Sequence, residues 1–118
     1  MAGPYDIPAY AAATVAARLA AGDRLVLLDV REPYELELAR IAGDVVNVPL
    51  SELVAHREAA LPAVLADRRA EIVVLCHHGV RSAQVTSWLR QLGYLRAYNL
   101  EGGIDAWARE VEPSVGFY

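Results

Sequence analysis

Lysine is absent from this sequence of 118 residues, since all 11 of its basic side chains are arginine. This absence excludes functions that depend on a lysine amine: Schiff-base catalysis, the phosphate-binding lysine of a P-loop and the lysine of a kinase. Cysteine occurs once, as Cys76, so the chain cannot form an intramolecular disulfide, a CxxC redox pair or a zinc knuckle. A secreted disulfide scaffold is excluded for the same reason.

Segments typical of targeting or membrane insertion are missing as well. The first basic residue is Arg18, so no basic region precedes an apolar stretch, and no apolar run approaches the roughly 20 residues of a membrane span. The net charge of −4 argues against nucleic acid or an anionic membrane as the main partner. We therefore expect a soluble, cytoplasmic protein with no nucleic-acid partner and no membrane partner.

The composition is that of one globular domain. Hydrophobic residues make up 55% and charged residues 22% of the chain, which is not the composition of a disordered chain. A domain of this size buries roughly two-thirds of the surface that its unfolded chain exposes, which is sufficient for a core. We predict a single domain over residues 1–118, in which the proline-containing residues 1–8 form an irregular N-terminal segment.

Short apolar runs alternate with helical patterns along the chain. Short, mainly apolar runs predict strands over residues 25–30, 45–48, 72–75 and 97–100, and the run over 25–30 is typical of a strand buried on both faces. Helical spacing predicts helices over residues 9–21, 34–41, from about 51, 81–92 and 104–110, with a further helical piece after Pro62. The alternation predicts an α/β fold with a central parallel sheet of about 4–5 strands and helices on both faces. Trp88 and Trp107 are expected to be core aromatics.

The reactive side chains follow the carboxyl ends of two predicted strands, where open α/β sheets bind ligands. Asp29 and Arg31 lie at the end of one strand, and residues 76–82, Cys-His-His-Gly-Val-Arg-Ser, follow another. A cysteine at a strand end, followed by a glycine-containing loop and a helix, lies near free backbone N–H groups that favour negative charge. Because Arg81 adds a cation in the same loop, we interpret Cys76 as a nucleophile rather than as the inert buried thiol usual for a lone cysteine.

Four segments resemble, in the same order, the motifs of rhodanese-like single-domain sulfurtransferases. Residues 28–32 resemble the motif after the family's second strand, 42–49 its Gly-Ala…Asn-hydrophobic-Pro segment, 76–82 its active-site loop and 100–107 its Gly-Gly…Ala-Trp signature. Two positions depart from the family pattern. Arg40 stands where a histidine is frequent, and Asp44 stands where a small residue is commoner, so the substrate selectivity stays open.

The resemblance implies a rhodanese-like three-layer fold and the transfer of a sulfane sulfur. The donor would be a molecule such as thiosulfate, the thiophilic acceptor cyanide or a thiol, and Cys76 would hold the sulfur as a covalent persulfide. The residues that would bind the substrate or stabilise the persulfide form one loop: His77, His78, Gly79, Val80, Arg81 and Ser82. The resemblance implies no metal and no organic cofactor, and its partners are a small-molecule sulfur donor and acceptor.

The alternative function is a persulfide carrier or regulatory module that delivers sulfur to a protein partner. It uses the same Cys76, so the motifs do not separate it from the enzyme. An inactive rhodanese-type binding domain is disfavoured because such domains typically lose the cysteine. A cysteine phosphatase or arsenate reductase is disfavoured too, because the spacing is Cys-x4-Arg rather than Cys-x5-Arg and no second cysteine can resolve an intermediate.

Two roles are open for each polar side chain of the loop. Arg81 either binds an oxyanion with its planar guanidinium or braces the loop, and Ser82 either donates to the sulfur or caps the helix. His77 and His78 either bind an anionic donor or point into water. A metal site of Cys76, His77 and His78 is not expected, because adjacent side chains diverge and a closed zinc site needs about four ligands.

Outside the loop, the polar residues near the site are expected to be structural. We expect Asp29 and Arg31 to form an ion pair near the site rather than to take part in the chemistry. His56 is expected to lie in solvent on a helix face. The pair Gly102-Gly103 is too short for a dinucleotide-binding motif and predicts a turn into the last helix.

Overall fold

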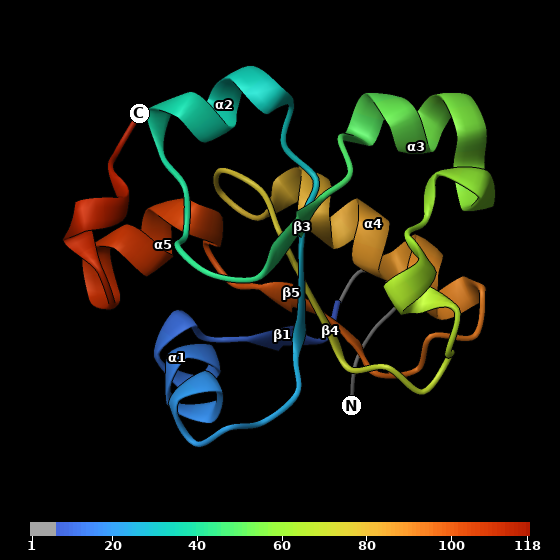
Figure 1. Ribbon diagram of the computed structural model, residues 1–118, viewed down its shortest axis with the longest axis horizontal. Helices are drawn as coiled ribbons and strands as arrows, with labels where there is room; N and C mark the ends of the chain where they lie inside the picture. Colours follow the sequence, from blue (N-terminus) through green and yellow to red (C-terminus); the bar gives the residue numbers. More distant parts are fainter. Residues whose placement is uncertain (1–6) are drawn as a thin grey trace.

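A five-stranded parallel sheet forms the centre of the protein in the computed structural model, which describes residues 7–118 (Figure 1). The strand order is β1-β5-β4-β2-β3, and all the pairings are parallel. The strands are β1 (Ala9–Tyr10), β2 (Val26–Asp29), β3 (Val45–Asn47), β4 (Ile72–Leu75) and β5 (Ala97–Leu100). This architecture confirms the predicted α/β fold with a parallel sheet.

Helices cover both faces of the sheet (Figure 1). One face is covered by α1 (Ala12–Ala20) and α5 (Gly103–Glu110), and the other by α3 (Leu50–His56) and α4 (Val80–Gln91). The short helix α2 (Pro33–Leu38) follows the carboxyl end of β2. Single turns of 3-10 helix complete the described chain: η1 (Arg57–Ala60), η2 (Ala63–Leu65) and η3 (Pro113–Val115).

Strand β4 separates two hydrophobic cores. Val73 and Leu75 belong to the core beneath α1 and α5, whereas Ile72, Val74 and Cys76 belong to the core beneath α3 and α4. All residues of β4 are buried, because helices cover the sheet on both faces, as the continuous apolar run predicts. The period of two along the strand therefore places the Cys76 side chain on the side of α3 and α4.

The first helix begins later than predicted. Ala9 and Tyr10, predicted as part of a helix over residues 9–21, form the edge strand β1, which pairs with β5. The Tyr10 ring stacks on the Tyr98 ring with centroids 4.2 Å apart, and its hydroxyl donates to Glu71 at 2.7 Å. These tertiary contacts override the helix propensity of the alanine-rich segment.

Two other predicted helices are shorter in the structure. Helix α2 ends at Leu38 rather than at residue 41, because Ala39 is extended and its carbonyl accepts a hydrogen bond from the buried Arg31 guanidinium at 2.8 Å. The piece after Pro62 is the single turn η2. Of the irregular segment predicted over residues 1–8, residues 1–6 lie outside the described residues, and residues 7 and 8 belong to no helix or strand.

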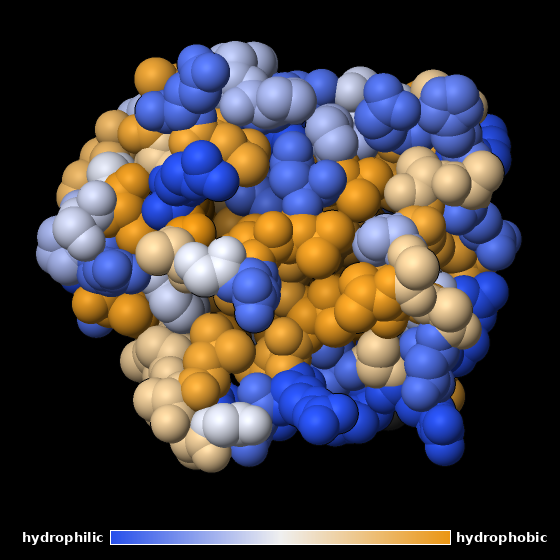
Figure 2. Space-filling view, in the orientation of Figure 1, coloured by the Kyte–Doolittle hydropathy of each residue, from blue (hydrophilic) through white to orange (hydrophobic). Residues whose placement is uncertain are grey.

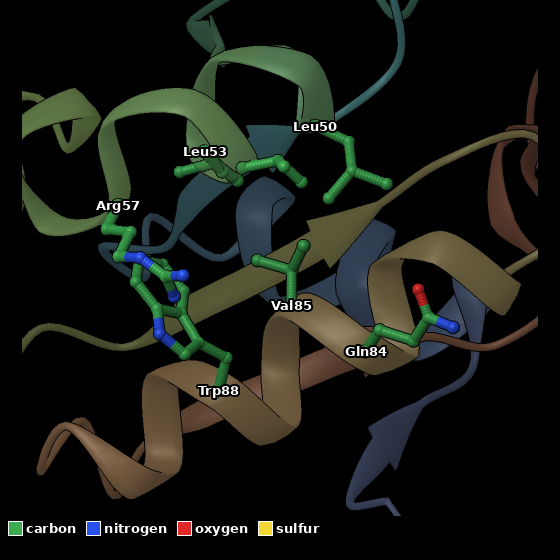
Figure 3. Close-up of a pocket in the computed structure, with 7 residues that line it drawn as sticks. Leu50, Leu53, Arg57, Gln84, Val85 and Trp88 are labelled. Carbon is green, nitrogen blue, oxygen red and sulfur yellow. The ribbon is translucent and has the colours of Figure 1, made fainter.

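The structure places the two tryptophans differently. Trp107 is buried in a core, as predicted. Trp88 is half-buried: it packs against a core but also borders a groove between α3 and α4, opposite Leu50 and Leu53 (Figure 3). Figure 2 shows hydrophobic residues gathered near the centre of the face that it draws. Within the described residues, no helix is long and apolar enough to cross a membrane.

Candidate active site

Cys76 lies directly after β4, where the sequence predicts it, and the loop of residues 76–79 leads into α4. Gly79 ends this loop with a φ of +98°, in the left-handed region that favours glycine. A Cβ at this position would lie 3.3 Å from the backbone nitrogen of Gly102 and 3.5 Å from the carbonyl oxygen of Leu100. A glycine thus allows the loop to pack closely against the chain after β5.

Backbone N–H groups point at the sulfur of Cys76. The N–H of Gly79 donates to Sγ at 3.1 Å, and the N–H of Ser82 donates to it at 3.4 Å. The Ser82 hydroxyl oxygen lies 3.2 Å from the buried Sγ. Since these N–H groups and the N-terminus of α4 carry positive partial charge, the loop favours an anionic sulfur. The side chain of Val80, the apolar residue of this segment, is exposed.

Asn99, which sequence reasoning missed, holds both sides of this loop. Its Nδ2 donates to the carbonyl oxygen of Gly79 at 3.1 Å, which fixes the orientation of the amide. Its Oδ1 therefore faces Ser82, whose hydroxyl donates to it at 2.5 Å. Because a hydroxyl has one proton, Ser82 turns its lone pairs, rather than its proton, towards the sulfur. The amide of Asn99 thus positions two of the groups around Sγ.

Replacing Asn99 by aspartate is expected to slow the alkylation of Cys76 by iodoacetamide at neutral pH. The carboxylate would place a negative charge behind Ser82, and we expect at least about a tenfold loss from its repulsion of the anionic sulfur. Asn99→Ala is the control, because it also removes the hydrogen bond to Gly79 but adds no charge, although it loses the hydrogen bond from Ser82 as well. Thermal unfolding shows whether both variants are folded. If they are, equal alkylation rates would contradict the conclusion that a charge at position 99 acts on the sulfur of Cys76.

The guanidinium of Arg81 is bound to a carboxylate rather than free in the loop. Its two terminal nitrogens donate to the Glu35 oxygens at 2.7 and 2.8 Å. The hydrogen bonds from Arg81 lower the pKa of Glu35 to about 2, although the carboxylate is buried on α2. Of the two roles that the sequence leaves open for Arg81, this geometry favours bracing, because the pair ties α4 to α2.

The expected ion pair of Asp29 and Arg31 is present at the same edge of the sheet. Arg31 is completely buried and donates to Asp29 from Nε at 3.0 Å and from Nη2 at 2.7 Å. Its Nη1 donates to the carbonyl oxygens of Glu35 and Ala39 at 3.2 and 2.8 Å. The pair therefore fixes α2, and with it the carboxylate that binds Arg81.

The two loop histidines lie side by side, so the expectation that their side chains diverge is wrong. The rings of His77 and His78 stack with centroids 3.9 Å apart, and the Tyr118 ring stacks on His77 at 3.8 Å. Burial lowers the pKa of His77. The Tyr118 hydroxyl donates to Glu35 at 2.9 Å, which makes it a further residue at the site that sequence reasoning missed. The His77 ring is therefore half-buried against these two rings rather than pointing freely into water.

A group of possible metal ligands differs from the one considered from the sequence. Ligand atoms of His77, His78 and Asp105 lie within 4.8 Å of one another. The Asp105 carboxylate, however, accepts a hydrogen bond from Arg109 at 2.8 Å and lies 4.0 Å from Nδ1 of His78. We therefore interpret Asp105 as a partner in an ion-pair network. The remaining histidine, His56, is exposed beside Glu52, as expected.

A family model described as the rhodanese-like domain matches residues 11–110. The chain is 39% identical over 98 residues to a sulfurtransferase from Allochromatium vinosum, covering 83% of this chain and 85% of that protein. It is 35% identical over 100 residues to the probable adenylyltransferase/sulfurtransferase MoeZ from Mycobacterium tuberculosis, covering 85% of this chain but 24% of that protein. The chain thus spans about a quarter of MoeZ and most of the shorter relative.

Solved structures agree with this match. A rhodanese-related protein from Thermoplasma volcanium superposes with a TM-score of 0.73 at 35% identity, covering 90% of this chain and 95% of that one. The human single-domain sulfurtransferase TSTD1 superposes with a TM-score of 0.70 at 31% identity, covering 87% and 96% of the two chains. Since sequence and fold match along nearly the same stretch, the chain belongs to the family of rhodanese-like sulfurtransferase domains.

Proposed function

We propose that the protein transfers a sulfane sulfur, from a donor such as thiosulfate to cyanide or a thiol, through a persulfide on Cys76. The observation that carries the proposal is the pair of N–H groups, of Gly79 and Ser82, that donate to Sγ. Both donors are fixed by the backbone, so they stabilise a charged sulfur without reorganisation. The family membership and the sulfurtransferases among the relatives support the same reaction.

The reaction consists of two displacements. The Cys76 thiolate attacks the outer sulfur of thiosulfate, the bond between the two thiosulfate sulfurs breaks, and sulfite leaves with the electron pair. An acceptor then attacks the terminal sulfur of the persulfide: cyanide becomes thiocyanate, and the electron pair of the broken bond returns to Cys76 as thiolate. Splitting the transfer in this way is covalent catalysis, and it needs neither a metal nor an organic cofactor.

The residues around Cys76 take different parts in this scheme. The loop residues His77, His78, Gly79, Val80, Arg81 and Ser82 form the wall and the N–H lining of the site. Arg81 holds the loop through Glu35, and the buried pair of Asp29 and Arg31 supports it without touching the substrate. A reducing compartment such as the cytoplasm would keep the lone cysteine available as a thiol.

Delivery of the sulfur to a protein is the second candidate function. It is favoured by relatives such as MoeZ, in which the matching stretch is about a quarter of a protein named adenylyltransferase/sulfurtransferase. In that case the acceptor is a protein nucleophile instead of a small molecule. The chemistry at Cys76 is the same in both candidates.

The test is to load the protein with sulfur and to follow its release. After incubation with sulfane-sulfur donors and desalting, mass spectrometry is expected to show the added mass of one sulfur atom, which cyanide removes. Since the chain has no second cysteine, nothing internal displaces this sulfur, and the loaded form persists. Fast discharge by cyanide and small thiols supports the enzyme, and slow discharge supports the carrier. The absence of added sulfur with thiosulfate, methanethiosulfonate and glutathione persulfide would contradict both.

A further inference from the structure

The arginines around the cysteine loop are all bound to carboxylates. Their closest N–O distances are 2.7 Å for Arg81 with Glu35, 2.7 Å for Arg31 with Asp29, and 2.8 Å for Arg109 with Asp105. Asp105 is adjacent to the loop, since its N–H donates to the carbonyl oxygen of His77 at 3.1 Å. The exposed His78 faces the same carboxylate at 4.0 Å. The positive charges of these three arginines are therefore each paired with a carboxylate.

Arg81, the arginine that follows the cysteine in the loop, is not available to a substrate. Both of its terminal nitrogens bind Glu35, whose side chain is 5% exposed. Turning Arg81 towards a bound anion would leave that carboxylate buried and unpaired, which is strongly unfavourable. Burial also lowers the pKa of the neighbouring His77, which keeps this imidazole neutral at neutral pH. Neither residue offers a positive charge to a donor.

The N–H groups that donate to Sγ stabilise one anionic sulfur. Those of Gly79 and Ser82 both point at Sγ. Thiosulfate brings two negative charges and must release sulfite, which carries both of them away. A persulfide releases a thiolate, and a thiosulfonate releases a sulfinate, so each leaving group carries one charge. Without a free cation, no side-chain charge of the loop compensates the second charge of thiosulfate.

We propose that this site selects sulfane-sulfur donors whose leaving group carries a single negative charge, and that Glu35 sets this selectivity by neutralising Arg81. The proposal rests on the persulfide chemistry proposed above. For a thiosulfonate, the Cys76 thiolate attacks the outer sulfur, the sulfur–sulfur bond breaks, and the sulfinate leaves with the electron pair. The total charge is −2 on both sides: a thiolate and a thiosulfonate give a persulfide anion and a sulfinate.

The experiment compares two donors that differ by one charge, methanethiosulfonate and thiosulfate. The rate of sulfur loading onto Cys76 is measured in single turnovers, and each rate is divided by that of the same donor with free cysteine. In the wild-type protein we expect methanethiosulfonate to load at least about tenfold faster, the effect of one uncompensated charge near the site. Glu35→Gln, which frees the charge of Arg81, is expected to shift this ratio about tenfold towards thiosulfate.

Glu37→Gln is the matched control, because it removes the same charge from an exposed position of α2. Its donor ratio is expected to equal that of the wild type. If Glu35→Gln fails to fold, the proposal is tested by the salt dependence of the rate at which thiosulfate loads the wild-type protein. Without a free cation, thiosulfate loading is expected to rise with ionic strength, because salt screens the repulsion between thiosulfate and the Cys76 thiolate. A free cation would instead make loading fall steeply as salt screens the attraction.

The outcomes separate this inference from the proposed function. Thiosulfate loading that matches or exceeds methanethiosulfonate loading, and that falls steeply with salt, would overturn the charge selectivity while leaving the persulfide chemistry intact. An unchanged donor ratio in folded Glu35→Gln would overturn the role of Glu35. Failure of both donors to load Cys76 would instead remove the proposed function on which the inference rests.

Discussion

Replacing Cys76 by serine is expected to reduce sulfur transfer from any donor to the uncatalysed background. A serine oxygen cannot form a persulfide, so the covalent route is lost entirely, and losses of roughly 10³-fold or more are usual when a nucleophile is removed. The measurement is steady-state turnover with methanethiosulfonate and cyanide, together with mass spectrometry of the donor-treated variant. No added sulfur is expected on the serine variant.

The fold of this variant is expected to persist. A serine hydroxyl is close in size to the thiol, and its oxygen can accept the same hydrogen bonds from the N–H groups of Gly79 and Ser82. Thermal unfolding close to that of the wild type checks this point. Turnover retained within a few-fold of the wild type, in a folded variant, would disprove the covalent mechanism.

Strands β2 to β5 and the cysteine loop were predictable because their pattern is local. The run Ile72–Leu75 is apolar at every position, as expected for a strand of a sheet covered on both faces, and Cys76 follows it. A short glycine-containing loop and a helix follow within a few residues, so the sequence alone places the N–H groups near the sulfur. Spacing of this kind needs no knowledge of the tertiary structure.

The partners of the loop were not predictable from local pattern, because they come from distant parts of the chain. Glu35 lies 46 residues before Arg81, and Asn99 lies 17 residues after Ser82. Glutamate is abundant in the predicted helix over residues 34–41, and nothing in the composition separates a buried glutamate from an exposed one. A polar residue within the apolar strand over 97–100 was the one available indication of Asn99, since buried polar groups are hydrogen-bonded.

The contacts of Tyr118 and of strand β1 were not predictable for the same reason, because their partners are distant in the sequence. Tyr118 reaches Glu35 across 83 residues of sequence, which no local motif encodes. Ala9 and Tyr10 follow the composition of the helix behind them, yet pairing with Asn99 and Leu100 makes them a strand. In both cases a tertiary contact, rather than the intrinsic preference of the segment, decides the conformation.

The glycine pair after β5 shows how a correct local prediction can miss the structural reason. Gly102-Gly103 forms the expected turn into α5. The structure adds that the backbone of this turn lies against the cysteine loop: the N–H of Ile104 donates to the carbonyl oxygen of Cys76 at 2.9 Å. Gly103 has a φ of +64°, and a Cβ there would lie 2.5 Å from the carbonyl oxygens of Cys76 and His77. The second glycine is thus required by contact as well as by conformation.

Gly103→Ala is therefore expected to destabilise the protein and to displace the cysteine loop. The left-handed conformation costs an alanine about 1 kcal/mol, and the contact with two backbone oxygens adds overpacking, for a total of roughly 3 kcal/mol or more. Gly22→Ala is the matched control, since Gly22 also has a positive φ, of +88°, but nothing lies within 4 Å of its Cβ position. Chemical denaturation compares the free energies of unfolding, and sulfur loading at Cys76 reports on the loop.

The difference between the two variants isolates the contact from the backbone strain. Gly22→Ala is expected to lose about 1 kcal/mol and to keep its loading rate. Gly103→Ala is expected to lose more stability and, where it remains folded, to load sulfur at least about tenfold more slowly, because a 1 Å displacement of a reacting group is sufficient for such a loss. Equal losses of stability in the two variants, with loading unchanged in both, would mean that α5 shifts to accommodate the added methyl group at no energetic cost and without displacing the loop. In that case the turn would not position Cys76.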